Sequence, residues 1–120
     1  MTILGVGIDI VEVERFRSAV RRGRVRFLGR IFSRRELAEL KKRRDPTEGL
    51  AARFAVKEAV IKAFGKRKDV PSSLTKIEVL KGDGGVPEVS LPHRTLRVLI
   101  SLSHSRGYAV ANAVLLKKGR

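Results

Sequence analysis

The sequence DPTEGLAARFAVKEAVIKAFG, residues 45–65, decides the fold because it predicts one long helix with a defined start and end. It opens with an N-cap acid, Asp45, followed by Pro at the first helical position and Glu at the third. It closes at Gly65, which we expect to cap the helix in the left-handed αL conformation. We therefore predict a helix that runs to Phe64 and packs on a sheet formed by the flanking segments.

Upstream of this helix, the sequence predicts one strand and two shorter helices. Residues 2–11, TILGVGIDIV, are rich in β-branched side chains and predict a buried strand. Residues 12–22 predict a short helix. Residues 33–43 predict a second one, because Ser33 and Glu36 have the spacing of a capping box.

Downstream of the long helix, the pattern changes to strands. Apolar and polar residues alternate over 74–81, and the turn signal at 82–85 predicts that residues 86–91 return as a hairpin partner. A second pair of apolar strands is predicted at 96–103 and 108–116. The order of elements indicates a single α+β domain, residues 1–120, with a mainly antiparallel sheet and one long helix packed on it.

The amino-acid composition limits the cellular compartments and the kinds of catalytic and metal site that are possible for this chain. The chain has no Cys, which excludes disulfides, zinc-thiolate sites and Cys nucleophiles and fits a reducing compartment. No apolar run approaches the length of a membrane span, and the N-terminus lacks the basic region of a signal peptide. We expect a cytoplasmic protein that does not bind membranes.

Charge indicates the kind of partner. The formal net charge is +15, and residues 15–44 alone hold 13 Lys and Arg against two acidic residues. Such a basic segment is either a solvated helical surface or a dock for an anionic partner. Nucleic acid and an acidic protein both fit the charge. With one Tyr, five Phe and no Trp, the chain has few side chains for stacking on bases, so nucleic acid is the less favoured partner.

Asp9 is the first residue with unusual chemistry. A carboxylate inside an apolar strand is costly unless it is paired or bound to a metal. The period of two places Gly5 and Gly7 on the same face, which predicts room there for a closely approaching ligand. The alternative is that Asp9 lies at the end of the strand and caps the next helix.

Glu58 and Lys62 are four residues apart on the long helix and therefore share a face. One interpretation is an exposed ion pair that contributes ~0.3–0.5 kcal/mol. The other joins Glu58 to Asp9, because two carboxylates can hold Mg²⁺ together with water and substrate phosphates. Lys62 could then neutralise a phosphate oxygen.

The two histidines suggest no metal centre or nucleophile of their own. His104 follows an apolar strand near a turn, where a lone His is more often structural, and we assign His93 no role. The chain has no second His at metal-ligand spacing, no G-x-S-x-G motif and no phosphate-binding loop of the GxxxxGK[ST] type.

Three segments resemble a known family in order and spacing: GVGIDIVEVERF (5–16), LAARFAVKEAVIKAFG (50–65) and ISLSHSRGYAVANAVL (100–115). The chain resembles the short trimeric branch of the 4'-phosphopantetheinyl transferases, the holo-acyl-carrier-protein synthases. The resemblance implies that family's fold and a Mg²⁺-dependent transfer of 4'-phosphopantetheine. The donor would be coenzyme A, the acceptor a serine of an acidic acyl carrier protein, and the product adenosine 3',5'-bisphosphate. It also implies a homotrimer with active sites shared between subunits.

The resemblance also implies roles for individual residues. Asp9 and Glu58 would hold Mg²⁺ against the pyrophosphate, and Lys62 would stabilise charge on the phosphate under attack; these three are the implied catalytic residues. The base is either Glu58 or a metal-bound water. The implied residues for coenzyme A are Arg53, Lys62, Gly65, Gly85, Pro87 and His104. The implied residues for the carrier protein are Arg15, Arg22 and Arg26.

Two departures from the family pattern concern the coenzyme A contacts. Val86 stands where the family usually has a Lys, and the Gly after the long helix is followed by Lys66-Arg67-Lys68-Asp69 in place of Thr-Gly. Lys81, Lys66 or Lys68 could compensate. Two other hypotheses stay open: a basic nucleic-acid-binding domain that uses residues 15–44, and a catalytically idle trimer that binds carrier proteins. Whether the carrier serves fatty-acid or polyketide biosynthesis is also open.

Overall fold

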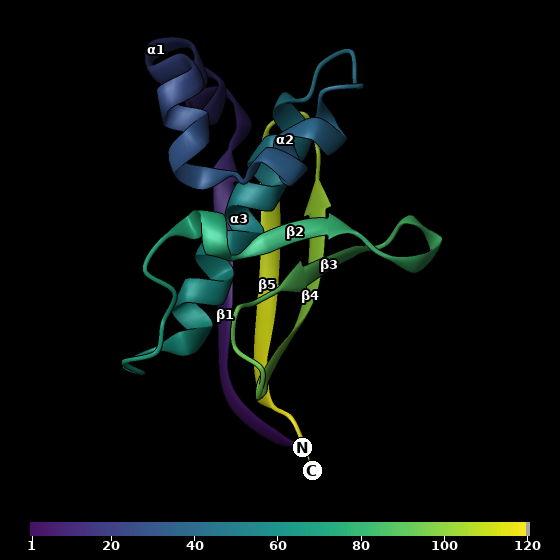
Figure 1. The fold of residues 1–120 in the computed structure, drawn as a ribbon. Coiled ribbons are helices and arrows are strands. Elements are labelled where there is room, and N and C mark those ends of the chain that lie inside the picture. The colour runs from purple at the N-terminus through teal and green to yellow at the C-terminus, as the bar shows by residue number, and fades with distance from the viewer. Residues whose placement is uncertain (120) are drawn as a thin grey trace.

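One long helix, α3 (Thr47–Phe64), lies across one face of a three-stranded antiparallel sheet in the computed structural model of the protein, which describes residues 1–119 (Figure 1). The strand order is β1-β5-β4, so the first and last strands of the chain are neighbours. Their bounds are β1 (Thr2–Glu12), β4 (Leu96–His104) and β5 (Tyr108–Lys117). The predicted long helix and the strands at both ends of the chain are confirmed.

The other elements surround α3. A separate two-stranded hairpin packs beside it, and two helices connect β1 to the start of α3 (Figure 1). Their bounds are α1 (Val13–Ile31), α2 (Arg34–Leu40), β2 (Glu78–Lys81) and β3 (Pro87–Ser90), with short 3-10 helices η1 (Leu74–Lys76) and η2 (Asp83–Gly85). The predicted α+β class is confirmed, with the strands divided between two antiparallel sheets.

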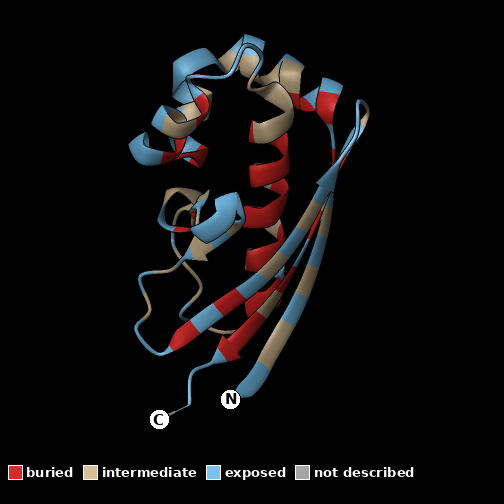
Figure 2. Ribbon diagram, turned by 90° about the vertical axis from the view of Figure 1, so that its right-hand side faces the viewer, coloured by how far each residue is buried: buried red, intermediate tan, exposed pale blue. Residues whose placement is uncertain are grey.

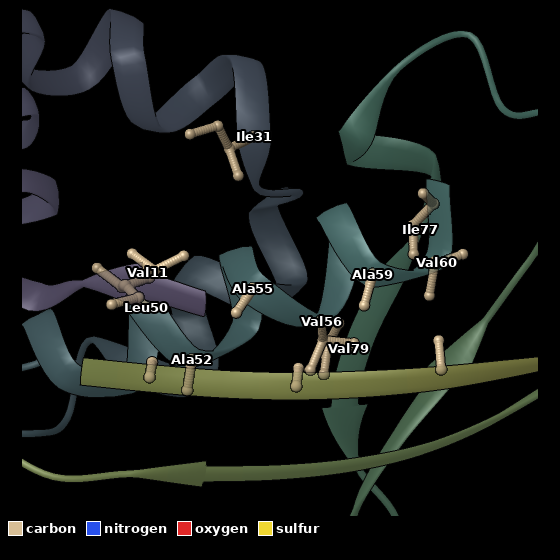
Figure 3. Close-up of a cluster of buried hydrophobic side chains, with 14 of the residues drawn as sticks. Val11, Ile31, Leu50, Ala52, Ala55, Val56, Ala59, Val60, Ile77 and Val79 are labelled. Carbon is tan, nitrogen blue, oxygen red and sulfur yellow. The ribbon is translucent and has the colours of Figure 1, made fainter. Parts of the chain in front are cut away.

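The core is built around α3, which is buried on nearly all sides (Figure 2). The face toward the sheet is lined with small side chains, such as Ala52 and Ala59, which let the helix approach the strands closely. The hairpin adds Ile77 and Val79 from the other side, and both are fully buried (Figure 3). The helix is therefore packed between the sheet on one side and the hairpin on the other.

Gly5 and Gly7 serve this helix contact. A Cβ at Gly5 would collide with the carbonyl oxygen of Ala63, and one at Gly7 with that of Ala59. The prediction that these glycines leave room for a ligand is wrong: they leave room for the backbone of α3. The sequence shows that the space exists, but only the packing shows what fills it.

The opposite face of β1 is open to solvent. Val6, Ile8 and Ile10 are 62–68% exposed in the single chain. The prediction of a buried strand is therefore right only for the face toward α3. β1 is an edge strand of a sheet that is covered on one side, so its other side presents an apolar surface.

The first helix is longer than predicted. We expected it to end at residue 22, but α1 continues to Ile31 through a kink at Arg24, whose φ of 49° and ψ of −135° are not helical. The turn after the kink packs Phe27 against Phe16, with ring centroids 5.9 Å apart. This tertiary contact stabilises the helical turns after Arg24, where the Arg-rich sequence has no apolar periodicity that would predict a helix.

The second helix has the predicted N-terminus. The Ser33 side chain accepts from the Glu36 backbone N–H at 3.2 Å, and the Glu36 carboxylate accepts from the Ser33 N–H at 2.9 Å. The capping box is therefore confirmed. The helix ends at Leu40, earlier than the predicted residue 43.

Both ends of α3 differ in detail from the prediction. The helix begins at Thr47, and the Asp45 carboxylate accepts from the Thr47 N–H at 3.1 Å, so the acid does satisfy a free donor at the helix start. Gly65 has a positive φ of 58°, but its ψ of −125° lies outside the αL region. The predicted αL cap is wrong, although the position does need the freedom of glycine.

The hairpin begins later than predicted. We expected a strand from residue 74, but Leu74–Lys76 form η1 and the strand starts at Glu78. The Ser73 side chain accepts from the Thr75 N–H at 3.3 Å, and this local bond favours a turn over an extended chain.

Candidate active site

Asp9, Glu58 and Lys62 meet where β1 crosses α3. The Lys62 ammonium donates to Asp9 Oδ1 at 3.0 Å and to the carbonyl oxygen of Ile8 at 2.9 Å. The Asp9 side chain is only 17% exposed, whereas that of Lys62 is 54% exposed. The close approach that Gly7 permits brings the strand carboxylate beside the helix. Asp9 therefore lies close to both Lys62 and Glu58, and the role of the two carboxylates as Mg²⁺ ligands stays a prediction.

The environment of Glu58 favours its protonated form. Partial burial raises the pKa of the Glu58 carboxyl, and the nearby Asp9 carboxylate raises it further, while Lys62 lowers it. Two carboxylates thus share a small space with one ammonium. Such a group is suited to binding a cation or accepting a proton.

A cleft of about 710 Å³ opens beside these carboxylates, between β1, α1 and α3. Asp9 and Glu58 line its polar side. The opposite wall is apolar and is formed by Phe16, Phe27 and Phe54, whose rings contact one another. The cleft therefore places an acidic centre next to an aromatic surface.

Charged side chains of both signs line the cleft, and Glu12 is one of the acidic ones. Arg15 lines it directly, and Arg22 and Arg26 are exposed on the same helix, on either side of the kink at Arg24. An acidic partner that docks on α1 would thus be guided toward Asp9 and Glu58.

Comparisons with known proteins identify the family of this chain. Residues 5–113 match the model of the 4'-phosphopantetheinyl transferase superfamily. The chain belongs to this superfamily. A holo-[acyl-carrier-protein] synthase of Thermodesulfovibrio yellowstonii is 43% identical over 113 residues, which cover 94% of this chain and 98% of the relative.

Solved structures of the superfamily share the fold. A holo-(acyl-carrier-protein) synthase from Bacillus anthracis, in complex with CoA (3',5'-ADP), has a TM-score of 0.85 at 35% identity and covers 98% of this chain and all of its own. The Helicobacter pylori holo-[acyl-carrier-protein] synthase in complex with coenzyme A has a TM-score of 0.80 at 29% identity, covering 92% and 99%. The predicted family and fold are confirmed.

None of the predicted coenzyme A residues that the structure describes lines the cleft, although Lys62 is paired with Asp9, which does. Within residues 1–119, none of Arg53, Gly65, Gly85, Pro87 and His104 lines it. His104 ends β4, where its Nδ1 lies 3.4 Å from Glu48 Oε2. Gly85 and Pro87 lie at the turn of the hairpin. A single chain therefore presents these predicted residues in separate places.

Arg53 already has partners within the chain. Its guanidinium donates to the carbonyl oxygen of Val79 at 2.7 Å and to Glu39 Oε1 at 2.9 Å, and its side chain is 6% exposed. Arg53 thus joins α3 to α2 and to the hairpin. Its contact with coenzyme A stays a prediction.

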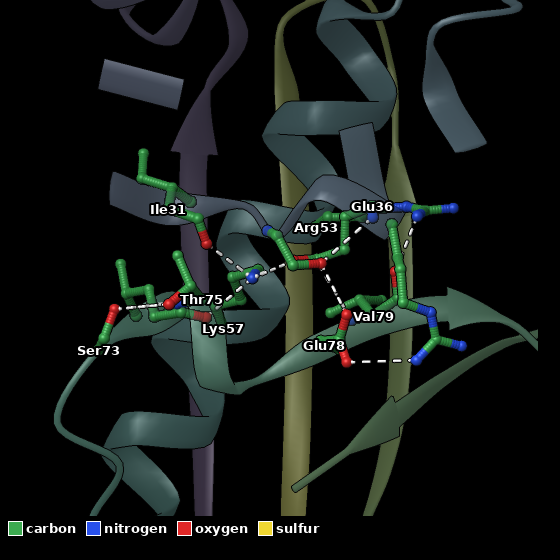
Figure 4. Close-up of polar contacts among 11 residues, drawn as sticks. Ile31, Glu36, Arg53, Lys57, Ser73, Thr75, Glu78 and Val79 are labelled. Carbon is green, nitrogen blue, oxygen red and sulfur yellow. Dashed lines mark hydrogen bonds and ion pairs between the residues drawn. The ribbon is translucent and has the colours of Figure 1, made fainter. Parts of the chain in front are cut away.

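Glu36 and Lys57 form a buried pair that the sequence analysis missed. The Lys57 ammonium donates to Glu36 Oε1, and to the carbonyl oxygens of Ile31 and Leu74, at 2.7–2.8 Å (Figure 4). Burial lowers the pKa of Lys57, and the Glu36 carboxylate opposes this effect. The sequence does contain a signal for this pair, because Lys57 and Glu58 interrupt an otherwise apolar stretch of the helix. The sequence analysis assigns a role to Glu58 and none to Lys57.

The donor set fits a hard divalent cation. Within residues 1–119 no cluster of three or more His, Cys, Asp or Glu side chains could enclose a metal by itself. Asp9 and Glu58 supply two carboxylates at an open cleft, which suits Mg²⁺ because this ion keeps waters and takes further oxygen ligands from phosphates.

None of the helices in the described part of the chain has both the length and the apolar character that crossing a membrane requires.

Proposed function

We propose that this protein transfers 4'-phosphopantetheine from coenzyme A to a serine of an apo acyl carrier protein, as a holo-acyl-carrier-protein synthase. The observation that carries the proposal is that Asp9 and Glu58 line one cleft, with Lys62 paired to Asp9 beside them. The superfamily match and the identity to holo-acyl-carrier-protein synthases support it.

The reaction is a phosphoryl transfer with the nucleophile on the partner. The serine oxygen attacks the phosphorus that carries the pantetheine arm. A new P–O bond forms, the bond to the second phosphate breaks, and adenosine 3',5'-bisphosphate leaves. The enzyme's part is positioning and charge stabilisation, which explains why it needs no nucleophile of its own.

Lys62 and Glu58 have distinct tasks in this reaction. The Lys62 ammonium, beside Asp9, stabilises the negative charge on the phosphate under attack. Glu58 lies one turn away and lines the cleft, so its carboxylate is the candidate acceptor for the serine proton.

Asp9 and Glu58 would together hold Mg²⁺. When bound, this ion neutralises charge on the pyrophosphate oxygens. Their carboxylates come from different elements, so the rigid contact between β1 and α3 fixes the distance between the two ligands.

A homotrimer would complete the coenzyme A site. The exposed side of the sheet carries Val6, Ile8 and Ile10 on β1. Val6 pairs with Val114 on β5, which pairs in turn with Leu99 on β4, and Leu99 is 48% exposed. A second copy of the chain that covers this face could bring its Gly85, Pro87 and His104 toward the cleft of its neighbour. The separation of these residues within one chain supports this assembly.

The basic face of α1 would receive the carrier protein. Arg15, Arg22 and Arg26 are exposed there, and the carriers used by this family are acidic. The charges would orient the carrier so that its serine enters the cleft beside Asp9 and Glu58.

Intact mass spectrometry tests the function directly. An apo acyl carrier protein is incubated with this protein, coenzyme A and Mg²⁺, with a second sample that contains EDTA. We expect a gain of one phosphopantetheine per carrier that is lost with EDTA. No gain, with a carrier that another transferase does modify, would contradict the proposal and favour an idle binding module or a nucleic-acid-binding protein.

A further inference from the structure

A second groove opens where the last turn of α1, helix α2 and the start of α3 meet. Its volume is about 440 Å³. Among the residues that the structure describes, none lines both this groove and the cleft of Asp9 and Glu58. The surface of the groove is mostly aliphatic and is formed by Leu28, Leu37, Leu40, Pro46 and Leu50. The groove is thus a separate feature that the proposed transfer reaction does not use.

The aliphatic lining of the groove reaches the solvent. Leu40 and Leu50 are buried and form its floor. Leu28 and Leu37 pack against the core with one part of their side chains and are only half-buried. A partner that covered these two side chains would remove further apolar surface from water, which favours association.

Cations surround the groove without acidic side chains among them. Arg34 and Lys41 line it, and no Asp or Glu of the described chain does. Arg43 lies at its edge, because its guanidinium is 3.4 Å from the place of a Cβ on Gly49, beside the end of the Leu40 side chain. Within residues 1–119, none of these three cations takes part in an ion pair.

The nearest acidic residues in the sequence do not balance this charge. Each acid of α2, and the one in the loop before α3, already has a cationic partner: Glu36 with Lys57, Glu39 with Arg53 and Asp45 with Arg17. The cations of the groove belong to the basic segment 15–44, of which the proposed carrier dock uses only Arg15, Arg22 and Arg26. The charge at the groove is therefore available to a partner.

We propose that this groove binds an acidic amphipathic helix of a partner protein other than the carrier. A helix is convex and about 10 Å across, so a single apolar stripe fills a groove between helices. Acidic side chains on both flanks of that stripe would reach Arg34, Lys41 and Arg43. The helix would bind outside the transferase site, so its binding does not depend on the proposed function.

Other anionic partners match the groove less well. Nucleic acid would meet a floor of Leu side chains, with no aromatic ring for stacking on bases. A lipid surface takes up apolar side chains that protrude, whereas these side chains form a concavity. A free fatty acid has a single carboxylate for three separate cations. Apolar lining together with several unpaired cations thus favours an acidic helix.

A designed peptide serves as the probe. It places Leu at helical positions i, i+3, i+4 and i+7 and Glu on both flanks, and a second peptide has the same composition in shuffled order. Fluorescence anisotropy at physiological salt measures binding to the full chain. We expect the amphipathic peptide to bind at least tenfold more tightly than the shuffled one. Equal affinities would show only general attraction to a chain of net charge +15, and these or no binding at all would overturn the proposal.

Two double variants test the cations. Arg34→Ala/Lys41→Ala should weaken binding of the amphipathic peptide at least tenfold. Lys66→Ala/Lys68→Ala removes the same charge at exposed positions that do not line the groove, and it should keep most of the affinity. If the two variants lose affinity alike, the peptide does not bind in this groove and the proposal fails.

A matched pair of single variants tests the apolar contact. Leu37→Ala shortens a half-buried side chain of the groove and should weaken peptide binding severalfold. Val86→Ala shortens an exposed apolar side chain in the hairpin turn and should not. Melting temperatures show that both variants are folded. Unchanged affinity in Leu37→Ala would contradict a helix seated on these side chains.

Other anions and the carrier complete the test. Vesicles of phosphatidylglycerol or a DNA duplex that bind more tightly than the peptide, and depend on Arg34 and Lys41, would overturn the proposal. An apo acyl carrier protein should leave the peptide bound, and displacement would show that the carrier itself occupies the groove. Arg34→Ala/Lys41→Ala should modify the carrier at the wild-type rate. A wild type that modifies no carrier would refute the proposed function and leave the result for the groove unchanged.

Discussion

The ammonium of Lys57 lies 2.7 Å from Glu36 Oε1, and both side chains are 0% exposed. The carboxylate also accepts from the backbone N–H groups of Ser33 and Val79 at 2.9 and 3.0 Å. This pair joins α2, α3 and the start of β2 on the side of α3 that faces away from the sheet (Figure 4). Lys57 directly precedes Glu58 in the chain.

Removing one member of this pair should be costly. We expect Lys57→Met to destabilise the protein by ~3–5 kcal/mol, because it leaves the Glu36 carboxylate buried without its cation. Denaturant unfolding measures the loss. The double variant Lys57→Met/Glu36→Gln should lose less than the sum of the single variants, and simple additivity would contradict a direct coupling.

A methyl group at position 7 should separate β1 from α3. In Gly7→Ala, the new Cβ meets the carbonyl oxygen of Ala59, and overpacking of this kind costs ~1–3 kcal/mol. Transfer activity should also fall, because Asp9 moves relative to Glu58. Gly107→Ala is the matched control, since a Cβ there has no heavy atom within 4 Å. Equal melting temperatures for the two variants would be inconsistent with the close contact.

Glu58 should be essential for transfer and dispensable for docking. We expect Glu58→Ala to abolish modification of the carrier, because it removes a metal ligand and the candidate base. Binding of the apo carrier, measured by calorimetry, should stay near the wild-type value. Undiminished transfer by this variant would refute the assignment.

Glu58 should also make stability depend on pH. Its pKa in the folded protein lies above the ordinary value, so the fold binds this proton more tightly than the unfolded chain does. The contribution is present below about pH 4.3 and is lost as the pH rises through the raised pKa. Glu58→Gln should therefore melt at a higher temperature than the wild type at pH 7.

The matched control for this pH effect is Glu88→Gln, since Glu88 is an exposed acid of β3. It should show no comparable gain at pH 7. A wild type as stable as Glu58→Gln at pH 7 would contradict the raised pKa.

Charge reversal on α1 should weaken carrier binding. We expect Arg15→Glu to raise the Kd for an apo acyl carrier protein at least tenfold in low salt and to flatten the dependence on salt concentration. Lys76→Glu changes the charge equally at an exposed position on η1 and should have little effect. If the two variants bind alike, the carrier docks elsewhere.

Local signals in the sequence were good predictors where the chain interacts with itself at short range. The capping box of Ser33 and Glu36 is a contact over three residues, and the long helix ends at Phe64 as predicted, directly before Gly65. The alternation in β1 correctly placed Asp9 on the same face as Gly5 and Gly7, which the structure shows to be the face toward α3. These features need no knowledge of the tertiary structure.

The errors concern features that only packing decides. The kink at Arg24 depends on Phe27 reaching Phe16, which lies on an earlier turn of the same helix. The full burial of Lys57 depends on Glu36 and on carbonyl groups from two other segments. For the candidate site, the sequence predicted Asp9, Glu58 and Lys62, which lie together in the structure, but it could not show that Gly85 and His104 do not line the cleft.

The exposed apolar face of β1 has a consequence for how activity is controlled. If a neighbouring subunit completes each site, turnover per chain depends on protein concentration, and dilution below the assembly threshold switches the enzyme off without any inhibitor. Two inactive variants, one altered at Glu58 and one at His104, would then restore activity when their subunits exchange, since mixed interfaces contain one intact site. The concentration of this protein in the cell would thus regulate its activity per chain.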